Sequence, residues 1–593
     1  MSILDITDKV IETDVLIIGG GVAGCACAIK ARDSGLDVTL FEKANTVRSG
    51  SAGIGIDHHG GPFPRDGMSV LKIVEDEARR FAGACLQQPD LNVRYRVASN
   101  MFWSFKEMEK IGVPMNWDDG EPYWMIQGPT NDMNRLRVNW QYIKPTLSKQ
   151  AKKRGTNILQ RTVAVDLLTK NGTVVGATGV NIRTGEFIVV KAKATVISTG
   201  MMHRQFDPTT PVPWKFKFRY HFCPASISGD GYAMAYRAGA ELVNMDVTGQ
   251  GYRIRDDLTL PYGHIPLNDG IPAKCLTWKG DEIMTPNNAK RYEELDRKGL
   301  TPLYQSLEHL PEDYHKRSDV CTAEERLVSF KIAEERGFNP YSHRYEMGAM
   351  KPIGHNRITG VVVDEEFKTR LKGLYAIGDT IAGGGGSSGA SCVGLLLGCD
   401  LKKFIENTGD QVIDEDQVKE QKESVLKPLS VKNGTEPLEL ESAVRYAMER
   451  YAGELKSEGK VLEGLRRLDT LRRKGLPLLK AKNPHYLLGC LEARNILEMS
   501  ILDMQAILER KETRGVFIRQ DYPDKDPEME GKLIFQRLKD GKPVVELPQD
   551  VIAWDEELNM PVVAYEEECW HCGICWMECP RRAIDIIYPV SFW

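Results

Sequence analysis

The chain has 593 residues, of which 42% are apolar and 27% are charged, and its formal net charge is −5. This balance excludes a fibrous or largely disordered protein. A nucleic-acid partner is not expected, because such proteins usually present a dominant basic surface. No run of 18 apolar residues occurs, and residues 1–12 lack the apolar core of a secretory signal. We expect a cytoplasmic protein without a transmembrane segment, which attaches to a membrane only through a partner.

A nucleotide-binding pattern opens the chain. Residues 14–18 form a short apolar run that is typical of a buried parallel strand. A G-x-G-x-x-G turn follows at 19–24, then an alanine-rich helix to about residue 34 and a second strand at 38–41. Glu42 ends that second strand, 18 residues after the last glycine of the turn. A strand, glycine turn, helix and acidic strand end together predict a dinucleotide site.

Each position of the turn has a physical task. Gly19 makes the tight turn, Gly21 lets a diphosphate approach the backbone, and Gly24 lets helix and strand pack closely. The helix begins at Val22 and Ala23, whose N–H groups would face the phosphates. Glu42 is placed to accept hydrogen bonds from the adenosine ribose.

Two later strand ends favour FAD over NAD. Residues 371–379 read as a strand that ends in Gly378 and Asp379, and residues 194–200 read as a strand that ends in Thr199 and Gly200. Three such elements around one nucleotide fit the longer cofactor, with Asp379 on the ribityl chain. Each strand alone would also fit an ordinary α/β protein.

Several further segments resemble the flavoprotein superfamily of fumarate reductase and succinate dehydrogenase, and within it the alpha subunits of adenylylsulfate reductases. The segments are 42–50, 139–145, 229–240, 378–389 and an Arg-Gly…Arg-x-Asp-Tyr-Pro stretch at 514–523. The resemblance covers about residues 10–525. It implies that FAD also contacts Lys43, Ala44, Ser49, Gly50, Val163, Asp230, Ser387 and Ser388.

Departures from the superfamily bear on the chemistry. Succinate dehydrogenases attach FAD through a histidine after an Arg-Ser pair, whereas Gly50 and Ser51 follow that pair here. We therefore expect noncovalent FAD. The stretch 248–252 has no histidine, and four glycines occupy 383–386 where fumarate-type enzymes carry an arginine segment. These differences argue against fumarate or succinate as the substrate.

Four residues are candidates for the substrate side of the flavin: Arg253, His343, Arg344 and His355. An arginine suits an anionic substrate, and a histidine suits proton transfer near neutral pH. Each of the four equally fits a surface charge or a satisfied core polar group. Met350 stands where the adenylylsulfate reductases have a histidine, so the resemblance implies a small organic or sulfur-containing substrate other than adenylylsulfate.

Four of the 13 cysteines are packed near the C-terminus: Cys569, Cys572, Cys575 and Cys579. Their C-x2-C-x2-C-x3-C-P spacing is that of bacterial ferredoxins and predicts a [4Fe–4S] cluster. A zinc site usually needs two separated cysteine pairs or spaced histidines.

The fourth cysteine raises a question of partners. In two-cluster ferredoxins the last cysteine of such a run binds the other cluster, and this chain has a single run. Our preferred hypothesis is that Cys579 serves a cluster shared with a ferredoxin-like partner or a second copy of the chain. We therefore expect a homodimer or a hetero-oligomer.

The predicted fold class is α/β. A Rossmann-like, two-dinucleotide FAD domain (1–240 and 345–415) is interrupted by a capping domain (241–344) that carries the substrate side. Helical periodicity predicts a helical bundle at 435–515, after a polar linker at 411–437. Residues 516–593 form a C-terminal extension with a hairpin near 532–547 and a small ferredoxin-like module. The predicted function is an FAD and iron–sulfur oxidoreductase; the alternative is an electron-relay subunit with no substrate of its own.

Overall fold

The structure is a computed structural model. It describes these parts of the chain, together with a few isolated positions: 6–55, 58–60, 91–113, 123–125, 135–137, 142–206, 226–254, 273–286, 288–312, 337–339, 341–355, 358–530, 532–539, 541–546, 552–555 and 560–563.

A seven-stranded sheet forms the base of the molecule. Its order is β6 (Asn157–Gln160), β2 (Val38–Glu42), β1 (Lys9–Ile18), β9 (Phe187–Ile197), β8 (Thr173–Asn181) and β7 (Thr162–Lys170). The strand β17 (Leu374–Ala376) joins the end of β9 in parallel. The predicted strands at 14–18, 38–41, 194–200 and 371–379 are therefore neighbours, and their carboxyl ends meet at one edge of the sheet.

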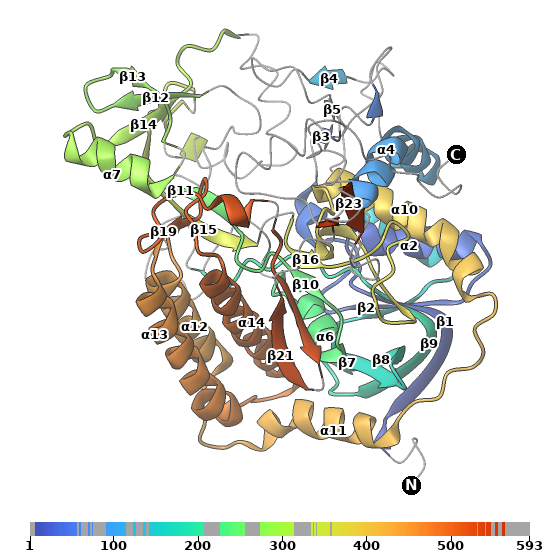
Figure 1. The fold of residues 1–593 in the computed structure, drawn as a ribbon. Helices are drawn as coiled ribbons and strands as arrows, with labels where there is room; N and C mark the ends of the chain where they lie inside the picture. The colour runs from blue at the N-terminus through green and yellow to red at the C-terminus, as the bar shows by residue number, and fades with distance from the viewer. Residues whose placement is uncertain are drawn as a thin grey trace.

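Helices cover one face of this sheet (Figure 1). The helix α2 (Val22–Asp33) packs against α10 (Gly386–Ile405) and α5 (Ile143–Lys153), and α4 (Leu91–Ile111) packs against α10. Small residues let α2 and α10 approach closely. A Cβ at Gly394 would lie 2.4 Å from the carbonyl oxygen of Ala23, and one at Gly398 would lie 2.6 Å from that of Cys27. Most of α2 is buried as a result.

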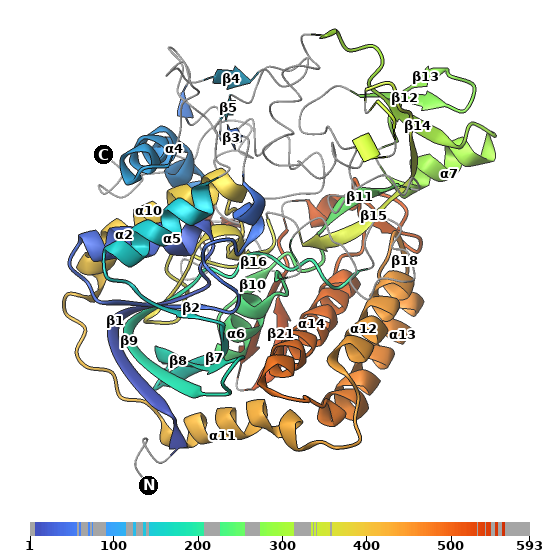
Figure 2. The same ribbon diagram turned by 180° about the vertical axis from the view of Figure 1, so that it is seen from behind.

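A second sheet belongs to the segment predicted as the capping domain. Its order is β11 (Thr248–Ile254), β15 (Tyr345–His355), β14 (Leu303–Ser306), β12 (Lys274–Thr277) and β13 (Glu282–Ile283), with α7 (Ala289–Arg297) against β15. Figure 2 shows this part projecting from the body of the molecule. Because β15 pairs with β11 and β14, the sheet continues to His355, past the predicted boundary at residue 344.

The C-terminal extension returns to the FAD-binding part. A hairpin is formed by β20 (Phe535–Lys539) and β21 (Lys542–Glu546), close to the predicted position. It extends a small sheet through β10 (Leu242–Val243) to β16 (Gly360–Val361). Further strands are β3 (His58–Gly60), β4 (Tyr123–Met125), β5 (Arg135–Arg137), β22 (Ile552–Asp555) and β23 (Met560–Val563).

The predicted helical region contains α12 (Pro437–Tyr451), α13 (Glu458–Thr470) and α14 (Pro484–Glu509), which pack on one another, and α14 also contacts α6 (Asp230–Ala238). The short strands β18 (Leu455–Lys456) and β19 (Ile518–Arg519) pair beside them. The predicted linker is wrong in part, because α11 (Glu415–Leu426) lies inside it. This helix buries Val418 and Val425, and Gln421 donates to the carbonyl of Leu167. No helix among the described residues is long and apolar enough to cross a membrane.

A buried lysine beside α13 gives a testable pH dependence. Lys456 is 1% exposed, and its Nζ donates to the carbonyl of Gly453 at 2.8 Å. Burial lowers the pKa of Lys456 from its usual 10.5 to about 8. Between these values the unfolded chain holds more protons than the folded one, so this lysine makes stability rise with pH.

We expect Lys456→Met to increase the unfolding free energy at pH 7 by about 1–3 kcal/mol, because a desolvated charge is removed. The variant should also lose part of the rise in stability between pH 8 and 10.5. Denaturant titrations at pH 7 and pH 10 measure both effects. The exposed Lys460 supplies the control variant Lys460→Met. A Lys456→Met protein that is less stable than the wild type at pH 7 would contradict the argument.

Candidate functional site

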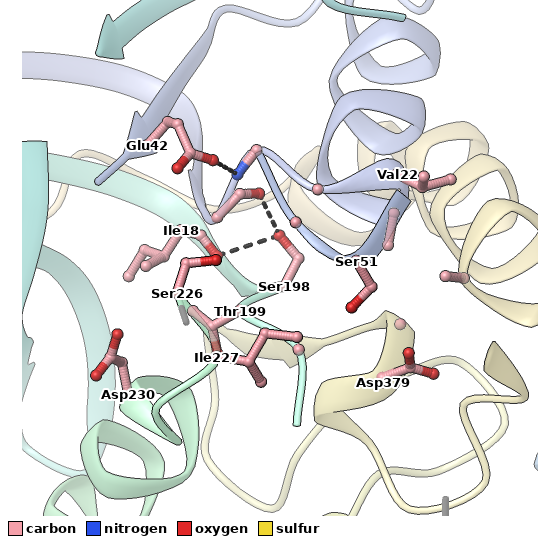
Figure 3. Close-up of a pocket in the computed structure, with 18 of the residues that line it drawn as sticks. Ile18, Val22, Glu42, Ser51, Ser198, Thr199, Ser226, Ile227, Asp230 and Asp379 are labelled. Atoms are coloured by element: carbon pink, nitrogen blue, oxygen red, sulfur yellow. Dashed lines mark hydrogen bonds between the residues drawn. The ribbon is translucent and has the colours of Figure 1, made fainter. Parts of the chain in front are cut away.

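A cavity of about 280 Å³ opens where the carboxyl ends of β1, β9 and β17 meet. Figure 3 shows it between the glycine turn, the segment after β9 and the short helical turn η2 (Gly378–Thr380). Fourteen of the residues predicted to bind the cofactor line this cavity: Gly19, Gly21, Val22, Ala23, Glu42, Lys43, Gly50, Val163, Thr199, Gly200, Asp230, Gly378, Asp379 and Ser387. Segments far apart in the sequence thus form one site.

Four predicted residues lie behind the cavity wall. A Cβ at Gly24 would lie 2.0 Å from the carbonyl oxygen of Gly19, so this glycine lets the helix pack against the turn. Ser49 donates its hydroxyl to Glu42 Oε2 at 2.9 Å, and the Ala44 N–H donates to Glu42 Oε1 at 2.7 Å. Ser388 is buried next to the cavity-lining Ser387. These four residues support the wall.

Glu42 joins the second strand to the glycine turn. Its Oε2 also accepts the N–H of Gly20 at 3.0 Å, the bond drawn in Figure 3. Three donors therefore hold this carboxylate, which has room for about one more, since an ionised carboxylate accepts roughly four hydrogen bonds. Glu42 both fixes the turn and keeps acceptor capacity toward the cavity.

The strand ends are tied to one another by hydrogen bonds. The Gly200 N–H donates to Thr380 Oγ1 at 2.9 Å, and the Gly386 N–H donates to Asp379 Oδ1 at 2.9 Å. The Thr199 hydroxyl oxygen accepts the N–H of Gly231 at 3.0 Å. These bonds connect β9, η2, α6 and α10, so the far wall of the cavity is a rigid unit.

Sequence reasoning missed several lining residues. Ser198 donates its hydroxyl to the carbonyl of Gly19 at 2.7 Å, and a Cβ on Gly19 would lie 2.5 Å from the Ser198 carbonyl oxygen. Other lining residues absent from the prediction include Ser51, Met201, Ile227 and Met234. Ser51 and Ser198 directly follow or precede predicted positions, whereas the apolar residues carry no signal that separates them from core.

A buried ionic cluster borders the cavity. Lys43 Nζ lies 2.6 Å from Asp230 Oδ2 and 2.8 Å from Glu492 Oε1. The second oxygen of Glu492 lies 2.5 Å from Nη1 of Arg204. Burial alone would favour the neutral amine, but Asp230 and Glu492 outweigh it and raise the pKa of Lys43. The cavity wall is thereby locked to helix α14.

The four predicted catalytic residues lie on one two-stranded ribbon. Arg253 is in β11, which pairs with β15, and the other three residues precede or end β15. The strand β15 spans 11 residues, so its ends are about 33 Å apart at the usual rise. The four residues therefore cannot meet at one substrate.

The outer and inner ends of the ribbon differ in their surroundings. Arg344 forms an exposed ion pair with Glu308 at 3.0 Å, and the ring of His343 lies 4.7 Å from that of Tyr345. Neither residue lines the cavity described above. For Arg253 the backbone pairing is described and its side chain lies outside the described residues. The register slips between Gly249 and Gln250 and between Tyr252 and Ile254 lie on either side of it.

His355 occupies the inner end of the ribbon and is fully buried. Its Nε2 lies 2.9 Å from Asp503 Oδ1, and its ring centroid lies 5.6 Å from that of Tyr232. The Tyr232 hydroxyl in turn donates to the carbonyl oxygen of Asp379 at 3.2 Å. Burial raises the pKa of Asp503, against the opposing effect of His355. Two side-chain contacts thus join His355 to a cavity residue.

Three family models match the chain in order along its length. A model described as FAD binding domain matches residues 14–248, one described as Fumarate reductase flavoprotein C-term matches 441–563, and one described as 4Fe-4S binding domain matches 562–585. The chain is an FAD-dependent oxidoreductase of the fumarate reductase flavoprotein family. The predicted α/β fold class and the predicted cofactors, FAD and a [4Fe–4S] cluster, are confirmed.

Relatives of this flavoprotein align over most of its length. It is 25% identical over 570 residues to the flavoprotein-type subunit of the fumarate reductase (CoM/CoB) from Methanothermobacter marburgensis, covering 89% of this chain and 97% of the relative. It is 24% identical over 563 residues to an uncharacterized FAD-dependent oxidoreductase of Methanocaldococcus jannaschii, with the same two coverages. The adenylylsulfate reductase of Archaeoglobus fulgidus shares its fold, with a TM-score of 0.77 and 22% identity over 94% of this chain and 98% of that one.

The cavity of the flavoprotein fits the adenosine and diphosphate part of FAD. Gly21 faces open space, since the nearest atom to a Cβ built there lies 4.0 Å away. The first turn of α2 directs its backbone N–H groups from the same end. The predicted cluster ligands Cys569, Cys572, Cys575 and Cys579 lie outside the described residues, and the 4Fe-4S model covers all four.

Proposed function

We propose that this flavoprotein moves electrons between a small organic or sulfur-containing substrate and an iron–sulfur centre. The observation that carries the proposal is the combination on one chain of an FAD cavity, a capping sheet beside it and a ferredoxin-type cysteine run. When bound, FAD supplies the exchange between two-electron chemistry at the substrate and one-electron transfer to the cluster.

The residues of the chain divide the work of holding FAD. The turn at Gly21 and the start of α2 would bind the diphosphate, Glu42 the adenosine ribose and Asp379 the ribityl chain. Gly50 and Ser51 line the cavity where succinate dehydrogenases carry the histidine that bonds FAD. The proposal is therefore a noncovalent cofactor.

The substrate side is proposed to lie along the inner part of the β11–β15 ribbon. Arg253 is the candidate for an anionic group of the substrate, because it lies between the two register slips. His355 is a candidate positioning residue, since Tyr232 separates it from the cavity wall at Asp379. We assign the outer His343 and Arg344 to the hinge side of the ribbon, away from the reacting atoms.

Fumarate and succinate are not the proposed substrates, since the chain lacks the histidine and arginine segments named above. The alternative function is an electron-relay subunit with no substrate of its own. The named relatives include one component of a fumarate reductase, and an iron–sulfur electron-transfer partner fits a cluster at the end of the chain. We place the protein in the cytoplasm, in a homodimer or a hetero-oligomer.

Loss of the cluster tests the proposed electron path. We expect anaerobically purified Cys572→Ser protein to lose the cluster absorbance and its EPR signal while it keeps stoichiometric FAD, because the two cofactors bind different parts of the chain. Reoxidation of its reduced flavin by a one-electron ferredoxin-type acceptor should slow about a hundredfold or more. Stopped-flow absorbance of the flavin measures the rate.

The matched control is Cys399→Ser, which removes an exposed thiol of α10 outside the motif. It should leave both cofactors and the rate unchanged. Equal rates in wild type and Cys572→Ser would show that the cluster is not on the path. Reoxidation of the reduced flavin by fumarate as fast as by the ferredoxin-type acceptor would overturn the substrate part of the proposal.

A further inference from the structure

A lysine is completely buried beneath the glycine turn. Lys144, in the first turn of α5, is 0% exposed. Its Nζ donates to the carbonyl oxygen of Gly20 and lies 3.6 Å from Sγ of Cys25. Lys144 itself does not line the cavity, whereas Gly20 and Gly21 do. The ammonium group therefore approaches the turn from the side opposite to the cofactor.

The charge of this ammonium is not matched by a protein carboxylate. Among the described residues, no Asp or Glu oxygen lies within 4.0 Å of Lys144 Nζ, in contrast to the ionic cluster of Lys43. The two groups that Lys144 contacts are neutral, a carbonyl and a thiol whose pKa burial raises. A buried ammonium without a counter-ion is costly, so an anion nearby would stabilise it.

The carbonyl contact also fixes the direction of a neighbouring N–H. Among the described residues the single cis peptide is Thr301–Pro302, so the Gly20–Gly21 peptide is trans. In a planar trans peptide the carbonyl oxygen and the following N–H point in opposite directions. Because the Gly20 oxygen points to Lys144, the Gly21 N–H points away from Lys144, toward the cavity side. No hydrogen bond from the Gly21 N–H to a described residue occurs.

Other contacts hold the same peptide from both ends. The Gly20 N–H donates to Glu42 Oε2 at 3.0 Å, and the Cys25 thiol donates to the Gly20 carbonyl at 3.3 Å. Gly20 has no room to turn, since a Cβ there would lie 2.5 Å from Thr46 Cγ2. The orientation of the turn is thus built into the protein before any cofactor binds.

We propose that Lys144 is a positioning residue for the FAD diphosphate, which orients the Gly20–Gly21 peptide and places a positive charge directly behind it. The diphosphate supplies the anion that the buried ammonium lacks. Lys144 adds to the partial positive charge at the N-terminus of α2 from a protected, water-free position. This inference rests on the proposed FAD site and adds a residue to it.

Two variants of the full-length protein test the inference, each stripped of FAD and titrated with FAD by flavin fluorescence. Lys144→Met should weaken FAD binding at least tenfold, because both the charge and the carbonyl contact are lost. Lys144→Gln keeps a donor for the Gly20 carbonyl but no charge, so its affinity should fall less. The control Lys149→Met, an exposed lysine of the same helix, should stay within twofold of wild type.

Thermal stability separates a positioning role from a structural one. The Lys144→Met apoprotein should melt at or above the wild-type apoprotein, since an unmatched buried charge is removed, while the stabilisation by FAD should shrink. Equal losses in the apo and FAD-bound forms, or an unchanged FAD affinity in both variants, would overturn the inference. Lys144→Gln decides the question if Lys144→Met does not fold. A wild-type apoprotein that takes up no FAD would instead overturn the FAD site itself.

Discussion

An alanine at Gly21 is expected to leave the apoprotein folded and to weaken FAD binding about a hundredfold or more. The backbone at Gly21 has a φ of −66° in an extended conformation that alanine adopts without strain. A Cβ there meets no protein atom closer than 4.0 Å, so the apoprotein has space for it. The same methyl group would occupy the surface that the diphosphate must approach.

The matched comparison is Gly24→Ala, three residues further along the turn. There a Cβ would lie 2.0 Å from the backbone oxygen of Gly19, and both the turn and the helix must move. We expect Gly24→Ala to lower the melting temperature of the apoprotein, whereas Gly21→Ala should not. FAD titration and apoprotein melting curves measure the two effects separately. Tight FAD binding by Gly21→Ala would show that the diphosphate lies elsewhere.

The nucleotide site was predictable from the sequence because its chemistry is local. The spacing of Gly19, Gly21 and Gly24 follows from the geometry of one turn, and Glu42 follows one strand later. The strand ends at Thr199 and at Gly378 carry their own short patterns. What joined them was the assumption that parallel strands end at one edge, and the pairing of β1, β9 and β17 agrees with it.

Lys144 was not predictable as a buried residue. Lysine is rarely fully buried, and nothing in residues 139–145 marks this one as different from the exposed Lys149. Its contact with Gly20 joins positions 124 residues apart, so it depends on how α5 packs on α2. A sequence pattern read in short windows does not contain this information.

The helix α11 shows the opposite error, in which composition concealed regular structure. Its sequence is rich in Glu, Lys and Gln, and its buried hydrophobic residues are Val418 and Val425, seven positions apart. That stripe is too narrow to distinguish a surface helix from a polar linker. Side-chain bonds supply the rest of the contact, since the Thr169 N–H donates to Gln417 Oε1 at 2.9 Å.

Replacing Arg204 with methionine is expected to lower the unfolding free energy by about 3–5 kcal/mol, the usual effect of breaking a buried ion pair from one side. Arg204 lies 2.6 Å from Glu441 and 2.5 Å from Glu492, and all three side chains are nearly buried. Lys43 and Arg445 remain in the cluster after the change. One negative charge would then be unmatched between the cavity wall, α12 and α14.

The loss should depend on pH in a defined direction. In the wild type, burial opposes ionisation of Glu441, but Arg204 and Arg445 outweigh it and lower the pKa of that carboxyl. Its contribution is present above the usual carboxyl range and is lost as pH falls. In Arg204→Met the carboxyl pKa should rise instead, and protonation then relieves the unmatched charge. The gap between variant and wild type should therefore be largest at pH 7.5 and smaller at pH 5.

Denaturant titrations at the two pH values measure this gap. The control Arg466→Met removes the same charge from an exposed pair with Glu463 on α13, where we expect a change of about 1 kcal/mol or less. Because Lys43 and Asp230 line the cavity and share the cluster through Glu492, Arg204→Met should also weaken FAD binding, whereas Arg466→Met should not. An Arg204→Met protein as stable as the control at pH 7.5 would mean that the cluster does not couple the helical region to the FAD cavity.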